Sequence, residues 1–384
     1  MNLILIMYEI IDLTKNFNFK IHSEKFFEDF KHVLKTDKKV LIIDYIEADA
    51  FWPIQKYGRN VIDVLTCFFK NFDNDVYYVT ADLSAIELYE KYLKENNLKK
   101  KIHIVIYPFS TLIKDMSGHL LEKEFMKRLN FSYNSLIIDK TKKINFKINK
   151  NFICLISKPK NYRLIFLNNL INYKYFEYSL SHTNGKNSIL ENDLDYHTLS
   201  KNIISDKTNP FKISCAKNKN LSEFSQFYYE DDKLILEDLI HYVPIEFLKS
   251  NVNIVCESYC EDSVMYTEKT WKSIYYGKPF LILGAKNQNV KLKQLGFFIY
   301  DDVFNYEFDR QDDIITRMNM LILEIKKFIN LNPEDFKKIL KKIEYKVVLN
   351  KKTYEKILVR EKDYINCCRE NNSELIEQLI NKFG

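Results

Sequence analysis

The sequence lacks the features of several large protein classes. No run of residues approaches the roughly 20 apolar positions that a membrane-spanning helix needs, so we expect no transmembrane segment. The seven cysteines include no Cys-x-x-Cys pair, and their odd number argues for a reducing compartment. We therefore expect a cytoplasmic protein. Histidine and cysteine form no cluster with the spacing of zinc ligands.

Glycine and proline are also scarce, with seven of each among 384 residues, while lysine, asparagine, isoleucine, phenylalanine and tyrosine dominate. This composition reflects an AT-rich coding sequence as much as a structural demand. The net charge of +6 is modest for the length. It allows anionic substrates but does not by itself indicate a nucleic-acid-binding protein. A chain of this length exceeds one ordinary core and predicts two or three domains.

Short apolar runs alternate with helical patterns in the first part of the chain. Residues 3–7 are apolar but few, and acidic residues follow, which fits a first strand better than a signal peptide. Further strands are expected at residues 39–44, 75–80 and 102–107, and helices at 60–72 and 83–96. Repeated strand–helix–strand units predict a parallel, doubly wound sheet, which we assign to an N-terminal domain over residues 1–145.

A second α/β region is expected over residues 151–310, after a basic segment at 140–150 that we interpret as the connection between domains. From residue 311 to residue 384 the sequence is charged and almost wholly helical in pattern, with Pro333 at the start of one helix. We expect this C-terminal segment to pack on both domains. The predicted fold class is α/β, with two doubly wound, Rossmann-like domains and a helical C-terminal extension.

The stretch from residue 252 to residue 284 is the most informative part of the chain. Residues 252–256 form a short apolar run with β-branched side chains, as a buried parallel strand requires. A helix is expected to begin at Thr267 and to end at Gly277, which can adopt the left-handed conformation that terminates helices. Residues 280–283 give a second apolar strand. Strand, helix and strand together predict a βαβ unit.

The loop after the first of these strands is expected to face a ligand. Ligands of open parallel sheets bind beyond the carboxyl ends of the strands, where the N–H groups of the next helix also point. Lys269 lies in the first turn, where the helix dipole disfavours a cation, and a bound phosphate would offset that placement. Glu268 is an acceptor suited to sugar or ribose hydroxyls. The alternative is that Thr267 is only an N-cap and Glu268 only a first-turn acid.

Three motifs in this stretch resemble the donor-binding motif of the α-1,3-fucosyltransferase family. They are Glu257-Ser258, Thr267-Glu268-Lys269 and Gly277-Lys278-Pro279. Ser258 stands where that family has asparagine, and the turn at Gly277 is about one residue shorter. A divergent group of phage and bacterial glycosyltransferases is more similar still, because it shares a tail like that at residues 294–297 and 301–304. The resemblance covers about residues 151–309.

Arg163 carries a second part of the resemblance. Residues 152–157 read as a strand, followed by a basic turn and a helical pattern over 164–171. In the glycosyltransferases that the chain resembles, an arginine at this helix start contacts the donor pyrophosphate. The guanidinium fork suits bidentate binding of phosphate. The alternative is an ordinary surface arginine near a helix start.

The resemblance implies a GT-B glycosyltransferase, in which two doubly wound domains face a cleft. It implies a nucleoside-diphosphate sugar as the donor substrate, with no tightly bound cofactor and no metal. Arg163 and Lys269 would then bind the phosphates, and Glu257 and Glu268 the hydroxyls, beside Thr267 at the helix start. The acceptor would be a glycan, a lipid-linked sugar or a hydroxylated DNA base.

An inverting transferase also needs a base that takes the proton of the acceptor hydroxyl. Glu47 and Asp49 are the candidates, because they follow the expected strand at 39–44 and so lie at the carboxyl end of the first sheet. Trp52 would supply a face for stacking of a sugar or base. The alternative is an ordinary acidic loop.

Two other functions stay open on the sequence. The pair Asp193 and Asp195 resembles the Asp-x-Asp motif that binds a divalent metal in the GT-A transferases, although the pair lies in a loop rich in asparagine and aspartate. Alternatively, the chain is a non-catalytic protein that binds nucleic acid or a partner on a degenerate transferase scaffold. The intact Glu268-Lys269 pair argues against that degeneration.

Overall fold

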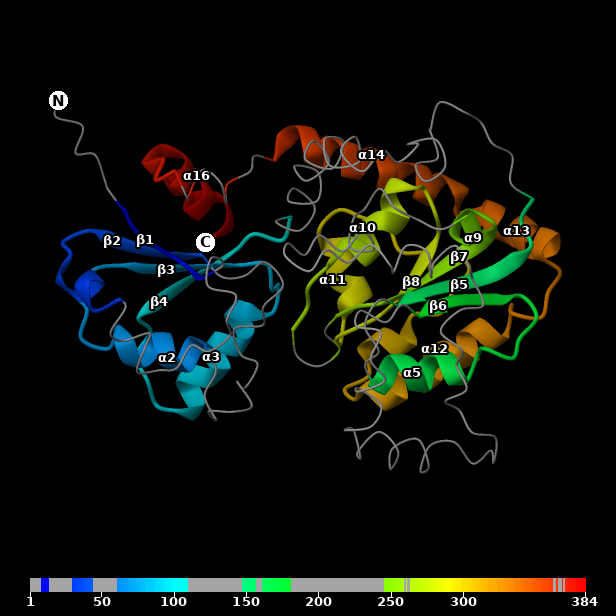
Figure 1. Ribbon diagram of the computed structural model, residues 1–384, viewed down its shortest axis with the longest axis horizontal. Coiled ribbons are helices and arrows are strands. Elements are labelled where there is room, and N and C mark those ends of the chain that lie inside the picture. Colours follow the sequence, from blue (N-terminus) through cyan, green and yellow to red (C-terminus); the bar gives the residue numbers. More distant parts are fainter. Residues whose placement is uncertain are drawn as a thin grey trace, which may run out of the picture. The chain divides into compact units, whose positions relative to one another are not determined.

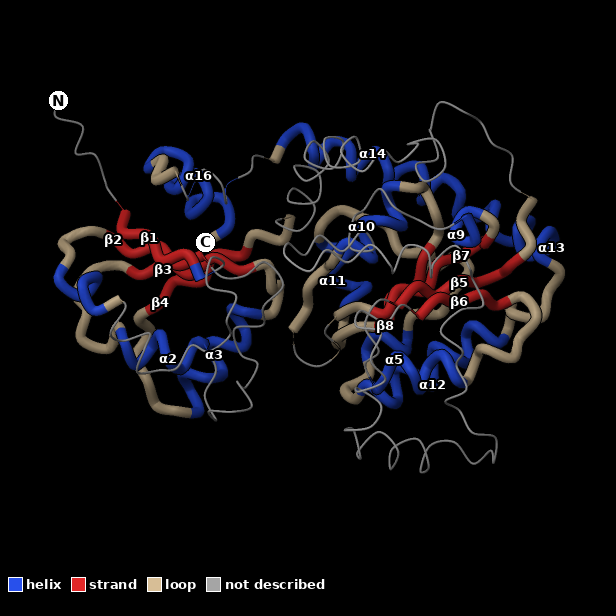
Figure 2. The backbone as a smooth tube through the Cα atoms, viewed as in Figure 1, coloured by secondary structure: helices blue, strands red, loops and turns tan. Residues whose placement is uncertain are grey.

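The computed structural model describes residues 8–13, 30–43, 61–109, 147–156, 161–180, 245–258, 260, 263–361, 364, 368 and 370–384. Within them the protein is a mixed α/β structure that contains two parallel four-stranded sheets with helices packed on them (Figures 1 and 2). This architecture is compatible with a two-domain Rossmann-like fold. The chain divides into unit 1, made of Met1–Lys114, Asp262–Thr267 and Ile357–Gly384, and unit 2, made of Asp115–Glu261 and Glu268–Lys356.

The sheet of unit 1 has its four strands in chain order. They are β1 (Tyr8–Asp12), β2 (Lys39–Ile43), β3 (Val76–Thr80) and β4 (Ile102–Ile106), and every neighbouring pair is parallel. The strands expected at 39–44, 75–80 and 102–107 are confirmed to within one residue. The strand expected at 3–7 lies outside the described residues, and the first described strand is β1.

Helices cover both faces of this sheet. The helices α2 (Val61–Phe68) and α3 (Ala85–Glu95) lie on one face and α16 (Ser373–Phe383) on the other (Figure 1). A short 3-10 helix, η2 (Lys31–Lys35), precedes β2. Because the sheet is covered on both sides, β2 is fully buried from Val40 to Ile43, which explains its continuous apolar sequence.

The sheet of unit 2 has a different strand order, β6-β5-β7-β8. Its strands are β5 (Lys150–Ile156), β6 (Phe176–Leu180), β7 (Ser250–Cys256) and β8 (Phe280–Leu283), again all parallel. The helices α5 (Asn161–Asn168) and α12 (Ile314–Lys326) lie on one face, and α9 (Ile245–Leu248) and α10 (Glu268–Tyr275) on the other (Figure 1). The strands expected at 252–256 and 280–283 are confirmed.

The helix expected at 164–171 begins earlier than its apolar pattern suggests. The structure starts α5 at Asn161. The physical reason is Tyr162, whose hydroxyl donates a hydrogen bond to the carbonyl oxygen of Glu257 and so brings the first turn against the end of β7. The pattern of apolar residues alone does not include this polar contact.

The end of α10 matches the expectation for Gly277. This glycine has a φ of 60°. Its N–H donates to the carbonyl oxygen of Ile274 at 3.0 Å, and the N–H of Lys278 donates to that of Ser273 at 2.9 Å. These two bonds are the Schellman arrangement that closes a helix around a left-handed residue. The chain then enters β8 directly after Pro279.

The C-terminal region is helical, as predicted. After α12 it contains α13 (Pro333–Leu340), the 3-10 helix η6 (Lys341–Ile343), α14 (Glu344–Arg360) and α16. Pro333 is the first residue of α13, and the side chain of Asn332 caps that helix by accepting from the N–H of Glu334 at 3.0 Å. The segment expected as one extension is divided, because residues up to Lys356 belong to unit 2 and later ones to unit 1.

Asp262–Thr267 belongs to unit 1, although it connects β7 with α10 along the chain. The backbone of Val264 explains this: its N–H donates to Asp82 Oδ1 at 2.9 Å, and its carbonyl oxygen accepts from the N–H of Leu83 at 3.0 Å. Asp82 is itself fully buried. The described helices include none that is long and apolar enough to cross a bilayer.

We expect the substitution Gly277→Ala to lower the free energy of unfolding by about 1 kcal/mol, because an L side chain is disfavoured in the left-handed region. An added Cβ would meet Val347 Cγ1 at 3.8 Å, an ordinary contact, so the cost is in the backbone. Urea denaturation measures it, with Gly277→Asn as the control that tolerates this conformation better. Equal urea midpoints for the wild type and Gly277→Ala would contradict the assignment.

The buried ammonium group of Lys278 is expected to make the free energy of unfolding depend on pH. Burial lowers the pKa of this ammonium group from 10.5 to about 7. Below pH 7 the folded and unfolded states are both protonated, and burying the charge costs free energy. From about pH 7 to about pH 10.5 only the unfolded state holds the proton, so this cost shrinks as the pH rises.

We therefore compare the free energy of unfolding of Lys278→Met with that of the wild type. The difference should favour the variant by up to roughly 4 kcal/mol more at about pH 6 than at about pH 10. The free energy of unfolding at both pH values measures the difference. Lys341→Met, at an exposed position, is the control and should show no such trend. A pH-independent effect of Lys278→Met would contradict the lowered pKa.

Candidate functional site

The strand order of unit 2 marks the carboxyl ends of two of its strands as a candidate ligand site. From β5 the chain proceeds to β6 on one side, whereas β7 lies on the other side of β5. Such a switch point leaves a crevice at the carboxyl ends of the two strands, where open α/β sheets bind ligands. Among the described strands of unit 1 the order is sequential, without a switch point. The residues after Ile156 and Cys256 are therefore the candidates.

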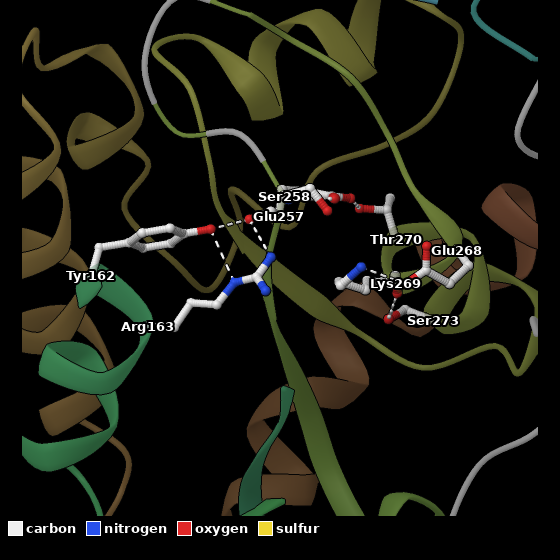
Figure 3. Close-up of polar contacts among 8 residues, drawn as sticks. All are labelled: Tyr162, Arg163, Glu257, Ser258, Glu268, Lys269, Thr270 and Ser273. Carbon is white, nitrogen blue, oxygen red and sulfur yellow. Dashed lines mark hydrogen bonds and ion pairs between the residues drawn. The ribbon is translucent and has the colours of Figure 1, made fainter. Parts of the chain in front are cut away.

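Arg163 lies at this switch point. It is the third residue of α5 and is 2% exposed. Its Nη2 donates to the carbonyl oxygen of Glu257 at 2.8 Å, and its Nε donates to the hydroxyl of Tyr162 at 3.0 Å (Figure 3). Burial acts to lower the pKa of Arg163, but Tyr162, Cys256 and Glu257 hold it above its ordinary value. A guanidinium that stays charged thus lies buried against the end of β7.

Glu257 connects the end of β7 with the first turn of α10. Its side chain is fully buried. Its Oε1 accepts from the hydroxyl of Thr270 at 2.6 Å, and its Oε2 accepts from the N–H of Ser258 at 3.3 Å (Figure 3). The carboxylate predicted to bind hydroxyls therefore already binds one, from within the protein. Its role toward a ligand stays a prediction.

Glu268 and Lys269 form an ion pair in the first turn of α10 (Figure 3). Their side chains are 6% and 15% exposed, respectively. Burial acts to raise the pKa of Glu268, but Lys269 and Lys272 outweigh it and hold that pKa below its ordinary value. The carboxylate of Glu268 therefore stays ionised at neutral pH. The pair combines an acid that the helix dipole favours with a base that it disfavours.

Ser273 connects α10 with β7. Ser273 Oγ accepts from Nδ2 of Asn253, in β7, at 2.8 Å and donates to the carbonyl oxygen of Lys269 at 3.4 Å. Thr267 is buried and directly precedes α10, at the position predicted for the N-cap. The structure thus brings four of the five predicted ligand-binding residues, Arg163, Glu257, Glu268 and Lys269, to β7 and α10 of unit 2, and the fifth, Thr267, is the residue before α10.

Sequence analysis did not select Arg317, which the structure adds to this region. This arginine of α12 is 2% exposed, and its Nη2 donates to the carbonyl oxygen of Cys260. Its signal in the sequence is weak: it is one arginine in a helix of 13 residues that also contains threonine, asparagine, glutamate and lysine. Its partner is 57 residues away, a separation that no local pattern reveals.

The remaining predicted residues lie outside the described part of the chain. They are the candidate bases Glu47 and Asp49, the aromatic Trp52, and the pair Asp193 and Asp195. Among the described residues no group of three or more histidine, cysteine, aspartate or glutamate side chains is arranged to hold a metal ion. Asp193 and Asp195 are not among these residues, so a metal site at this pair stays a hypothesis.

A cavity of about 640 Å³ lies elsewhere in unit 2. Two of its lining residues, Phe304 and Phe328, pack against Phe336, which packs on Phe152 near the start of β5. None of the residues that line the cavity belongs to the candidate site at the switch point. Its charged lining is internally paired, with the ion pairs Lys293–Asp301, Arg310–Glu307 and Lys327–Glu324.

No protein-family model and no curated protein sequence matches this chain. The chemistry of the site therefore follows from its own residues. Arg163 and Lys269 supply positive charge, and the first turn of α10 supplies N–H groups that favour an anion. Glu257 and Glu268 supply acceptors for hydroxyl groups. The arrangement suits a ligand that is anionic at one end and rich in hydroxyls at the other.

We expect Thr270→Val to lower the free energy of unfolding by about 1–3 kcal/mol, because it leaves the buried Glu257 carboxylate without one donor. Thr270→Ser keeps the hydroxyl and should recover most of that loss. Urea denaturation of both variants measures the effect. If the valine and serine variants unfold at the same urea concentration, the bond between Thr270 and Glu257 does not stabilise the strand end.

Proposed function

We propose that this protein is a glycosyltransferase that transfers a sugar from a nucleoside-diphosphate donor to a hydroxyl group. The observation that carries the proposal is the group Arg163, Glu257, Glu268 and Lys269 at the switch point of the unit 2 sheet. Their charges and positions agree with what the resemblance to the fucosyltransferase-like enzymes implies. Two parallel sheets with helices packed on them support a GT-B arrangement, which we propose as the fold family.

In this proposal the phosphates of the donor bind at the first turn of α10. Lys269 and Arg163 neutralise the diphosphate, which departs with the negative charge when the glycosidic bond breaks. Fixed positive groups and N–H dipoles that meet developing charge are the largest contribution that such a site makes to rate. No metal ion is required for this step, and the enzyme would use the donor as a substrate without a resident cofactor.

The acceptor is proposed to be a glycan or a hydroxylated DNA base. A carboxylate would take the proton of the acceptor hydroxyl as it attacks the sugar from the face opposite the leaving diphosphate, which inverts the anomeric centre. Glu47 and Asp49 are proposed for that role from their position in the sequence. The N-terminal domain would then bind the acceptor.

We expect one class among the UDP, GDP, CMP and dTDP sugars to raise the thermal midpoint of the full chain. A ligand at ~100 times its dissociation constant stabilises a protein by roughly 2.7 kcal/mol, a shift of several degrees. Glu268→Ala and Lys269→Ala should lose most of that shift. Lys338→Ala is the control, because Lys338 is an exposed lysine in the last turn of another helix, α13, and also pairs with an acid, Asp335.

The thermal unfolding measurements with the four classes of nucleotide sugar are repeated in Mn²⁺ and in EDTA. A metal-dependent GT-A enzyme would show no rise of the thermal midpoint in EDTA. If no donor raises the midpoint under either condition, the transferase proposal fails. A nucleic-acid-binding protein would instead bind DNA with an affinity that falls steeply as salt rises. Equal shifts in the wild type and in Lys269→Ala would place the donor elsewhere.

A further inference from the structure

Arg317 donates hydrogen bonds to four backbone carbonyl oxygens. Its Nε donates to Gly284 at 3.1 Å, and its Nη1 donates to Gln311 at 2.6 Å and to Asp312 at 2.8 Å. Its Nη2 donates to Cys260. One side chain of α12 thus binds the residue that follows β8, the residues that precede α12, and the chain beyond β7.

These contacts concern the candidate site because β7 and β8 are neighbours. Cys256 is opposite Leu283, and the N–H of Glu257 donates to the carbonyl oxygen of Leu283 at 3.0 Å. Gly284 therefore lies next to the end of β7, where Glu257 connects to α10. Arg317 holds Cys260, three residues beyond Glu257, against that same strand end.

Arg163 makes the corresponding contact from α5. It binds the carbonyl oxygen of Glu257 at 2.8 Å. The helices α5 and α12 lie on the same face of the unit 2 sheet and contact each other (Figure 1). Two buried guanidinium groups from neighbouring helices therefore bind the chain after β7 at two points, Glu257 and Cys260.

We propose that Arg317 is a positioning residue of the donor site, which acts with Arg163 to fix the chain between β7 and α10 for binding of a nucleoside diphosphate. This inference rests on the proposed function. Arginine suits the role because its planar fork supplies five N–H donors in fixed directions, whereas lysine offers three donors on one atom. Burial of two positive groups paired with carbonyl dipoles also leaves the strand ends attractive to an anion.

The test compares Arg317→Lys, which keeps the charge, with Arg310→Lys as the matched control. Arg310 is 65% exposed and pairs only with its neighbour Glu307 in the described residues. Both variants are made in the otherwise unchanged full chain, and nucleotide binding is measured by isothermal titration calorimetry.

Two measurements are made well below the unfolding temperature of each variant. The first is hydrogen exchange of peptides covering residues 255–260 in the free protein. The second is the dissociation constant of UDP or GDP, whichever stabilises the wild type. We expect Arg317→Lys to raise both the exchange rate and the dissociation constant about tenfold, and Arg310→Lys to change neither.

Unchanged exchange in Arg317→Lys would overturn the proposal, because the arginine would not fix this chain. Faster exchange with an unchanged dissociation constant would also overturn it, since the role would then be structural only. If no nucleotide sugar among those of UDP, GDP, CMP and dTDP stabilises the wild type, the proposed function fails, and the exchange data alone still show whether Arg317 fixes the chain.

Should Arg317→Lys not fold, the wild type supplies the second test. The proposal requires that nucleotide binding slows exchange at 255–260 and at 311–317 together, because Arg317 connects the two segments. Slower exchange at 255–260 without any change at 311–317 would overturn it.

Discussion

The carbonyl and carboxylate groups of Glu257 are the point on which the candidate site depends. The carbonyl oxygen accepts from Tyr162 and Arg163, the carboxylate accepts from Thr270, and the N–H donates to Leu283. One residue therefore connects β7 with β8, α5 and α10. A buried carboxylate is costly unless it is fully hydrogen-bonded, so the same bonds that form the site are required for the fold.

Much of the fold was predictable because its signals are local. The strands β2 and β8 are continuous apolar runs that are buried on both faces, and Gly277 ends α10 because the left-handed region favours glycine. The order β6-β5-β7-β8 was not predictable in this way, since strand pairing depends on contacts between residues far apart in the sequence. The link of Val264 to Asp82, across 182 residues, is of the same kind.

The candidate site shows the same division. Arg163 and Glu257 were selected as ligand-binding residues because their types and positions suit phosphate and hydroxyl groups. The structure adds a contact that the sequence does not reveal: the guanidinium of Arg163, in α5, donates to the carbonyl oxygen of Glu257, 94 residues away at the end of β7. Sequence analysis did not identify Arg317 because its partners are backbone carbonyl oxygens. Every residue has such an oxygen, so no sequence pattern marks these partners. Only the burial of Arg317, which the structure shows, requires polar partners for its charge.

If the proposed function is right, the Glu268–Lys269 pair makes binding of the donor's phosphates depend on binding of its hydroxyl groups. In the free protein the acid and the base neutralise each other at the start of α10. A phosphate that binds Lys269 competes with Glu268 for the ammonium group. Glu268 then has carboxylate oxygens available for the hydroxyls of the sugar or ribose. A bare phosphate would break the ion pair without giving Glu268 new partners, whereas a complete donor replaces both interactions. Selectivity for the complete donor follows from this exchange.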